Sequence, residues 1–206
     1  IRDRSKGINL PSQADILARR LNTLKKETKT NKLIIVGDLK HKIPNIEKEE
    51  NFEIKKFIDF LEFEKIILIK GNHDGKIEKI LKGMKSKIKI KKEFLKIENI
   101  LLTHGHRNIR KKVKHDFLII GHVHPYLRLV DRLKVNYFEQ VWLRYKEENG
   151  KEIIIMPNFN ELCGATIVNE QDLLGPIARR IPKEDIDVYL LDGTYLGKIK
   201  DLEIRE

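Results

Sequence analysis

Short apolar runs that end in polar side chains constrain the fold of this chain more than any other feature. The clearest run covers residues 66–69 and is followed by Gly71, Asn72, His73 and Asp74. A run this short, rich in β-branched residues and closed by glycine, is typical of a strand buried on both faces. In open α/β sheets, ligands bind just beyond the carboxyl ends of such strands. We therefore expect a functional site at this strand end.

The same pattern occurs four more times along the chain. Apolar runs at residues 33–36, 100–102, 117–120 and 153–155 lead into polar segments that begin with Gly37-Asp38, Thr103-His104, Gly121-His122 and Pro157-Asn158. If these strands share one edge of a sheet, their polar ends meet in one place.

Amphipathic patterns between the apolar runs predict helices. Apolar residues at helical spacing indicate one helix from Ser12, its expected N-cap, to Thr28. Similar patterns predict helices near residues 54–61 and 77–81. An order of strand, helix and strand favours a parallel sheet covered by helices.

The pattern changes after Pro125. Residues 126–130, 133–138 and 141–145 read as successive strands, and Asn149-Gly150 and Asp192-Gly193 have the composition of hairpin turns. The second half is therefore expected to be mainly antiparallel. The complete prediction is an α/β fold in which two mixed sheets pack together and are flanked by helices, in a single domain over residues 1–206.

Composition limits the class of protein. The 206 residues are enough for one large domain with a full core, and no apolar stretch is long enough to cross a bilayer. The formal net charge of +11 attracts polyanions such as nucleic acids, although ion pairs that confer heat stability explain the many charged residues about equally well. The single cysteine, Cys163, excludes an internal disulfide and fits a reducing cytoplasm. We expect it to be a buried, inert thiol.

The residues at the strand ends have the chemistry of a metal site. Five of them carry oxygen or imidazole donors, namely Asp38, Asn72, His104, His122 and His124. This set suits manganese, iron or zinc, is too rich in nitrogen for calcium, and lacks the thiolates of a structural zinc site. The carboxylate of Asp38 can bridge two cations. A turn after Gly121 is expected to direct His122 and His124 to separate ions.

Each of these residues alone has a simpler interpretation. A single Gly-Asp is more often a turn or helix cap, and a single histidine is more often structural. However, five of the seven histidines fall in these loops, and a cluster favours a metal site. His41 and His115 are expected to be solvated or to support other residues.

These motifs resemble, in order, those of the calcineurin-like metallophosphoesterases. The resemblance spans residues 33–125 and rests on four segments, which are Gly37-Asp38, Gly71-Asn72-His73-Asp74, Thr103-His104-Gly105-His106 and Gly121-His122-Val123-His124. The tail, with residues 157–164 and 191–197, resembles the archaeal SbcD-related phosphoesterases. The family fold is a sandwich of two mixed sheets flanked by helices, which agrees with the prediction above.

The resemblance also implies roles for individual residues. Two divalent metal ions are expected, with manganese first and iron, zinc, nickel or cobalt as alternatives. The implied ligands of one metal are Asp38, Asn72, His104 and His122. Asp38 would bridge to the second metal, which His124 also binds, and a bridging hydroxide would attack phosphorus. His73 would contact the phosphate and assist the leaving group, with Asp74 orienting it.

The chain departs from the family pattern at its start. The family opens with a strand that ends in Asp-x-His, whereas this chain begins Ile1-Arg2-Asp3-Arg4-Ser5. We expect that the sequence lacks this first strand, that the intact polypeptide carries Asp-x-His upstream, and that the chain alone binds one metal well at most and is a poor catalyst. The alternative is a natural loss of one metal.

Basic residues near the expected site suggest the substrate. His106, Arg107, Arg110 and Lys111 are tentative substrate-binding residues, and lysines between 85 and 91 alternate with isoleucines. They predict a track for a phosphate backbone, or else ordinary solvated faces. The leading hypothesis is a phosphodiesterase acting on nucleotides or nucleic acid. The alternative is a non-catalytic nucleic-acid-binding or scaffold protein. The oligomeric state stays open, a dimer included.

Overall fold

The computed structural model describes residues 2–3, 8–9, 13–40, 48–84, 87–110 and 112–203. They form two compact units. The first unit holds Ile1–Ile35, Leu39–Leu68 and His73–Ile90, and the second holds Val36–Asp38, Ile69–Asn72 and Lys91–Glu206. None of the described helices is long and apolar enough to cross a membrane. The predictions of a single domain and of a cytoplasmic location stay predictions.

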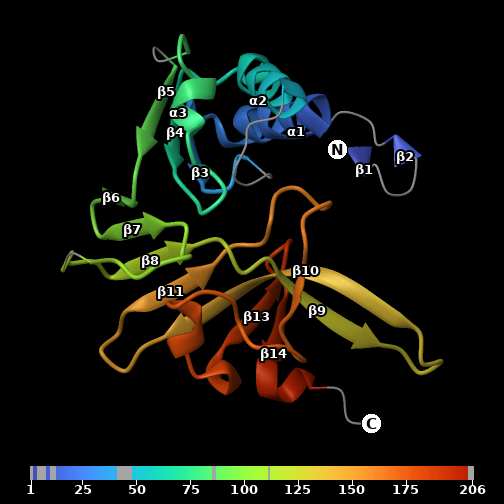
Figure 1. The fold of residues 1–206 in the computed structure, drawn as a ribbon. Helices are drawn as coiled ribbons and strands as arrows, with labels where there is room; N and C mark the ends of the chain where they lie inside the picture. The colour runs from blue at the N-terminus through green and yellow to red at the C-terminus, as the bar shows by residue number, and fades with distance from the viewer. Residues whose placement is uncertain are drawn as a thin grey trace. The chain divides into compact units, whose positions relative to one another are not determined.

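The first unit combines helices with a sheet of three strands in the order β3-β4-β5. Its elements are α1 (Gln13–Thr28), β3 (Lys32–Val36), α2 (Lys48–Phe60), β4 (Lys65–Ile69), α3 (Ile77–Ile80) and β5 (Ile88–Lys91), labelled in Figure 1. The short strands β1 (Arg2–Asp3) and β2 (Ile8–Asn9) pair antiparallel. The predicted helices and strands of this region are confirmed, although Ser12 lies outside the described residues.

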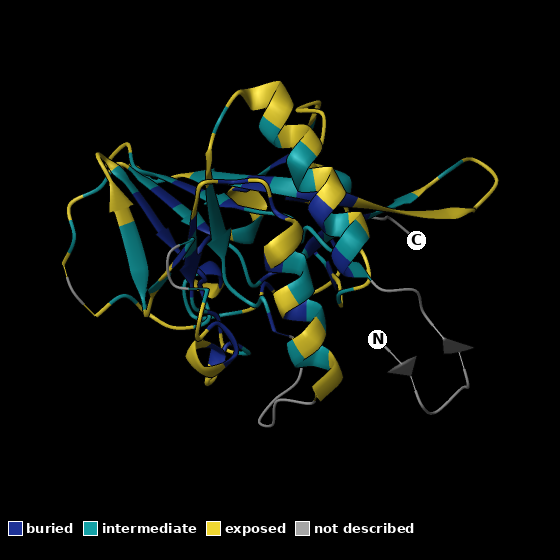
Figure 2. Ribbon diagram, turned by 90° about the horizontal axis from the view of Figure 1, so that it is seen from above, coloured by how far each residue is buried: buried dark blue, intermediate teal, exposed yellow. Residues whose placement is uncertain are grey.

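The core of the first unit explains why these segments are helical. Ala18 of α1 and Ile58 of α2 are buried in the same cluster as Ile66 and Leu68 of β4. Figure 2 shows buried, intermediate and exposed positions following one another along both long helices, as expected for helices with one face in a core.

The second unit is built on one sheet of nine strands. Its strands are β6 (Phe94–Ile97), β7 (Ile100–Thr103), β8 (Phe117–Ile120), β9 (Pro125–Val130), β10 (Asn136–Lys146), β11 (Glu152–Ile155), β12 (Thr166–Ile167), β13 (Asp187–Leu190) and β14 (Tyr195–Lys198). The main order is β12-β9-β10-β11-β8-β7-β6, with β13 paired to β10 and β14 to β13 (Figure 1). Three single-turn 3-10 helices cover Ala178–Arg180, Lys183–Asp185 and Ile199–Leu202.

Three parallel strands, β7, β8 and β11, set the position of the site. Leu101, Leu118 and Ile153 lie side by side across them and are buried in one core cluster. Because the three strands are parallel and in register, the residues that follow them leave from the same edge of the sheet. The remaining neighbours are mostly antiparallel, so the sheet is mixed, and the predicted α/β fold with two sheets is confirmed.

One strand prediction is wrong. Residues 133–138 and 141–145 do not form two strands, because β10 runs without interruption from Asn136 to Lys146. The residues between the two predicted strands include no glycine or proline, so nothing there ends the strand. Both predicted hairpins are confirmed, with left-handed glycines at Gly150 (φ 85°) and Gly193 (φ 89°).

Candidate metal centre

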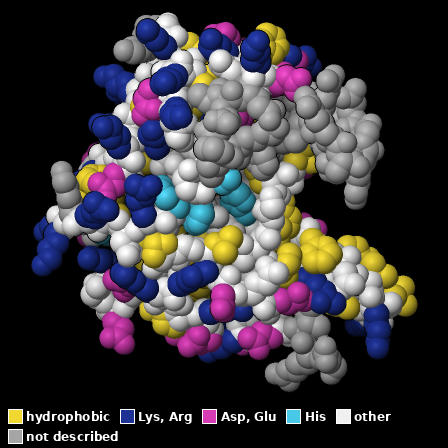
Figure 3. Space-filling view, in the orientation of Figure 1, with side chains coloured by type: hydrophobic (Ala, Val, Ile, Leu, Met, Phe, Trp, Pro, Cys, Tyr) yellow, Lys and Arg dark blue, Asp and Glu magenta, His cyan; other side chains and the backbone are white. Residues whose placement is uncertain are grey.

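Three of the predicted ligands meet within the second unit. Asp38, His104 and His122 follow strands β3, β7 and β8, and one ligand atom from each lies within 4.8 Å of the others. Figure 3 shows histidine side chains gathered in one place, with lysine and arginine side chains spread over much of the same face. These three residues form the candidate metal centre.

The ring of His104 is held in a defined orientation. It is only 2% exposed, and its Nδ1 lies 2.9 Å from the carbonyl oxygen of Val36. A carbonyl can only accept, so Nδ1–H donates this hydrogen bond and the lone pair of the neutral ring is on Nε2. That atom lies 3.0 Å from Oδ2 of Asp38 and 3.2 Å from Oδ1 of Asn72.

This arrangement favours a positive charge. Three acceptor atoms face one another, and the His104 nitrogen among them is buried, so a proton or a metal ion between them is favourable. A proton on Nε2 can bond to the two oxygens only. His122 adds a further ligand atom to the same group. A carboxylate, an amide oxygen and two imidazoles are suitable ligands for a divalent transition metal, so these residues fit the metal that the sequence predicts.

Backbone strain accompanies the ligands. Asp38, His122 and His124 all have left-handed backbones, with φ of 47°, 67° and 52°. This conformation costs about 1–2 kcal/mol for a residue with a Cβ atom, and such strain concentrates at functional sites. The left-handed turns fall on His122 and His124 themselves and not on Gly121, so the predicted physical reason for the turn is wrong.

His122 and His124 have different surroundings. The His122 ring lies 5.0 Å from the His104 ring, between centroids, whereas His124 is not part of the three-residue group found among the described residues. Nδ1 of His124 instead donates to the carbonyl oxygen of Gly164, at 2.9 Å. The contacts of the two imidazoles therefore differ.

Glycines make room for the ligands at three points. A Cβ atom on Gly37 would lie 2.1 Å from Nδ1 of His104, and one on Gly71 would lie 2.1 Å from Oδ1 of Asp38. One on Gly175, where φ is 86°, would lie 2.9 Å from Cδ2 of His122. The first two glycines belong to the predicted motifs. Gly175 follows β12, far along the chain, and no local signal identified it.

His106 lies beside this group. Its ring centroid is 5.2 Å from that of His104 and 6.2 Å from that of His122. Burial, followed by the positive charges of neighbouring side chains, lowers the pKa of His106 to about 4. Both of its ring nitrogens are buried without a hydrogen-bond partner among the described residues.

The other tentative substrate residues differ in position. Arg107 and Arg110 are exposed, and Lys111 lies outside the described residues, as does His41. Burial, and then the charge of Asp38, raises the pKa of the half-buried Cys163 thiol. A raised pKa favours the neutral thiol, in agreement with an inert cysteine.

The two predicted catalytic residues belong to the first unit. Asp74 is fully buried, and its Oδ1 accepts the backbone N–H of Lys40 at 3.1 Å. His73 is half-buried. Lys40 is itself buried, and its Nζ donates to the carbonyl oxygen of Gly75 at 3.5 Å. No local pattern singles out Lys40, because a lysine after a strand is normally solvated.

Comparisons with known proteins identify the family and the fold. Residues 10–191 match the family model of the calcineurin-like phosphoesterases. The chain belongs to this family. It is also similar to the crystal structure of Pseudomonas putida nuclease MPE, with a TM-score of 0.55 and 22% identity over 89% of this chain and 78% of that one. At this identity the similarity shows the fold alone. No curated protein matches, and the closer relation to SbcD-related phosphoesterases stays a prediction.

Proposed function

We propose that this phosphoesterase hydrolyses phosphodiesters of nucleotides or nucleic acids at a centre of two divalent metal ions. The observation that carries the proposal is the convergence of acceptor atoms on Nε2 of His104, which lies within 3.2 Å of oxygens from Asp38 and Asn72. Nuclease MPE, which shares the fold, points to nucleic acid as a substrate.

The proposed ligands divide between the two ions. Asn72, His104 and His122 would hold one ion, His124 would bind the other, and the carboxylate of Asp38 would bridge them. Manganese is the first candidate. When bound, such ions supply Lewis acidity and lower the pKa of water, which provides a hydroxide nucleophile near neutral pH.

The side chains of this chain would carry out the remaining tasks. His73 would contact the phosphate and donate a proton to the departing oxygen, and Asp74 would orient it. The burial of Asp74 and its bond from the Lys40 amide support this role, because a fixed carboxylate can hold an imidazole in one orientation. His106, neutral at physiological pH, would present a ring nitrogen to substrate, and Arg107 and Arg110 would attract its negative charge.

The test is turnover with defined substrates. The full-length protein supplied with Mn²⁺ is expected to cleave bis-p-nitrophenyl phosphate and single-stranded DNA, and to stop when the metal is chelated. Asn72→Ala and His122→Ala should abolish cleavage, whereas Asn99→Ala, an exposed asparagine bonded to Asp116, should not.

Two other outcomes would reject the proposal. Faster cleavage of p-nitrophenyl phosphate than of the diester would identify a phosphomonoesterase. Salt-dependent DNA binding without turnover would support the non-catalytic nucleic-acid-binding alternative, which the net charge of +11 favours.

A further inference from the structure

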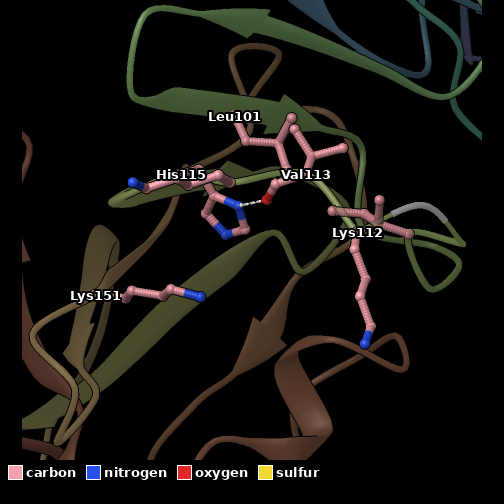
Figure 4. A pocket seen from close by; sticks show the side chains of 7 residues that line it. Leu101, Lys112, Val113, His115 and Lys151 are labelled. Carbon is pink, nitrogen blue, oxygen red and sulfur yellow. Dashed lines mark hydrogen bonds between the residues drawn. The ribbon is translucent and has the colours of Figure 1, made fainter.

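A second site lies in the second unit, away from the metal centre. It is a cavity of about 510 Å³, open to solvent. This volume is within the range of about 300–1,000 Å³ that small-molecule sites occupy. Figure 4 shows the side chains that line it.

The cavity and the metal centre occupy opposite ends of the same parallel strands. His115 precedes β8 and Lys151 precedes β11, and both line the cavity. His104 and His122 instead follow the carboxyl ends of β7 and β8. His115 and His122 lie beyond opposite ends of β8, and none of the residues that line the cavity is one of the three metal-centre residues.

One wall of the cavity is apolar. Leu101 of β7 is fully buried, and Ile109 and Val113 pack partly buried against the same core cluster. These side chains offer a surface of aliphatic carbon that water covers poorly. An apolar group of a ligand is the occupant that such a wall favours.

The rest of the lining is cationic. Lys112, Lys114 and Lys151 contribute three ammonium groups, and no acidic residue is among the described residues that line the cavity. In Figure 4 the nitrogen-bearing ends of Lys112, His115 and Lys151 lie on one side of the apolar side chains of Leu101 and Val113. Nδ1 of His115 donates to the carbonyl oxygen of Val113 at 2.7 Å, which fixes the ring.

We propose that this cavity binds a phosphorylated nucleoside. Three lysines without a neighbouring acid in the lining match a phosphate monoester, whose charge near pH 7 is about −1.5 to −2, better than they match a singly charged carboxylate. The apolar wall beside them would pack against the base, so one ligand would carry both a phosphate and a ring system. A free nucleotide and the phosphorylated end of a strand both offer this chemistry.

The test measures binding in the presence of a chelator, so that the metal centre plays no part. A negative result for the cavity is then independent of the result for the metal centre. Adenosine monophosphate, adenosine and inorganic phosphate are titrated calorimetrically into the intact chain in EDTA. We expect the nucleotide to bind at least tenfold more tightly than either of its parts. A strand with a 5′-phosphate, compared with the same strand carrying a 5′-hydroxyl, identifies whether strand ends or free nucleotides bind better.

Matched variants separate a site from general charge attraction. Lys112→Ala with Lys151→Ala should weaken nucleotide binding at least tenfold. Arg132→Ala with Lys200→Ala, which removes the same charge from exposed positions outside the cavity lining, should leave it within twofold. Equal weakening by both pairs, phosphate binding as tightly as the nucleotide, or no nucleotide binding at millimolar concentration would each overturn the proposal.

Discussion

Nε2 of His104 lies 3.0 Å from Oδ2 of Asp38, while Nδ1 of the same ring lies 2.9 Å from the carbonyl oxygen of Val36. The second contact determines the first, because the bond to the carbonyl places the proton on Nδ1 and turns the lone pair toward the carboxylate. A backbone carbonyl at the end of β3 thus prepares an imidazole from the end of β7 to bind a cation.

Removal of this imidazole should remove the metal. We expect His104→Ala to lower Mn²⁺ affinity by at least tenfold, because the change deletes a metal ligand. Loss of a residue that only supports a ligand already lowers metal affinity by about 10–100-fold. Metal titration of chelator-stripped protein measures the change. His115→Ala, which removes a histidine outside the metal centre, should bind Mn²⁺ as the parent does, and equal losses in the two variants would contradict the assignment.

Gly37→Ala should damage the metal centre through a collision with His104. The new Cβ would lie 2.1 Å from Nδ1 of the ring, which must move and give up its bond to Val36. Gly150→Ala is a matched control, since φ is 85° there and 84° at Gly37, but no atom lies within 4 Å of its Cβ. Both variants should lose similar conformational stability in urea titrations, and Gly37→Ala alone should lose Mn²⁺ affinity.

Gly175→Ala tests a contact that only the tertiary fold creates. Its Cβ would lie 2.8 Å from the carbonyl oxygen of Gly105 and 2.9 Å from Cδ2 of His122. Metal affinity and phosphodiester turnover should both fall several-fold because the His122 ring is displaced. Gly193→Ala, with φ of 89° and open space around its Cβ, should leave both unchanged. Unaltered metal binding in Gly175→Ala would show that this residue does not position His122.

Asp74 should have two separate roles. Its acceptor oxygen should contribute to stability, and its negative charge should contribute to activity. Asp74→Ala leaves the Lys40 amide without its carboxylate partner, which should cost about 1–3 kcal/mol in the free energy of unfolding. Asp74→Asn keeps an acceptor oxygen and should cost less, yet it should slow turnover because a neutral amide lacks the charge with which the carboxylate is proposed to orient His73. Urea denaturation and steady-state kinetics measure the two effects, and full activity of Asp74→Asn would argue against the orienting role.

A pair on the sheet should make stability depend on pH. Nε and Nη2 of Arg144 donate to the two carboxylate oxygens of Glu152 at 2.8 and 2.9 Å, and this lowers the pKa of the Glu152 carboxyl. A lowered pKa adds stability above the ordinary value of 4.5, and this stability is lost as the pH falls through the lowered pKa.

Glu152→Gln is the variant that tests this pair. Because Arg144 is partly exposed, the variant should lose only about 0.5–1 kcal/mol of unfolding free energy at pH 7. The difference from the parent should shrink as the pH falls below the lowered pKa. Glu184→Gln, at an exposed position, should match the parent throughout. A constant difference across this pH range would exclude the ion pair as its source.

The sequence by itself determined most of the strands, the residues at their ends and the kind of ligand they offer. Apolar runs such as residues 66–69 and glycines such as Gly37 are local signals, because burial and backbone freedom act over a few residues. They sufficed to predict most of the strands, though not β6, β12 or the continuity of β10, together with the two hairpins and the grouping of Asp38 with His104 and His122.

Only the tertiary structure decided how these parts meet. The register of β7, β8 and β11 sets which side chains share an edge, and the rotation of the His104 ring depends on the Val36 carbonyl. The approach of Gly175 to His122, the burial of Lys40 and the position of His115 in a cavity arise from segments distant in sequence. Such contacts depend on packing between elements, which no local pattern of residues encodes.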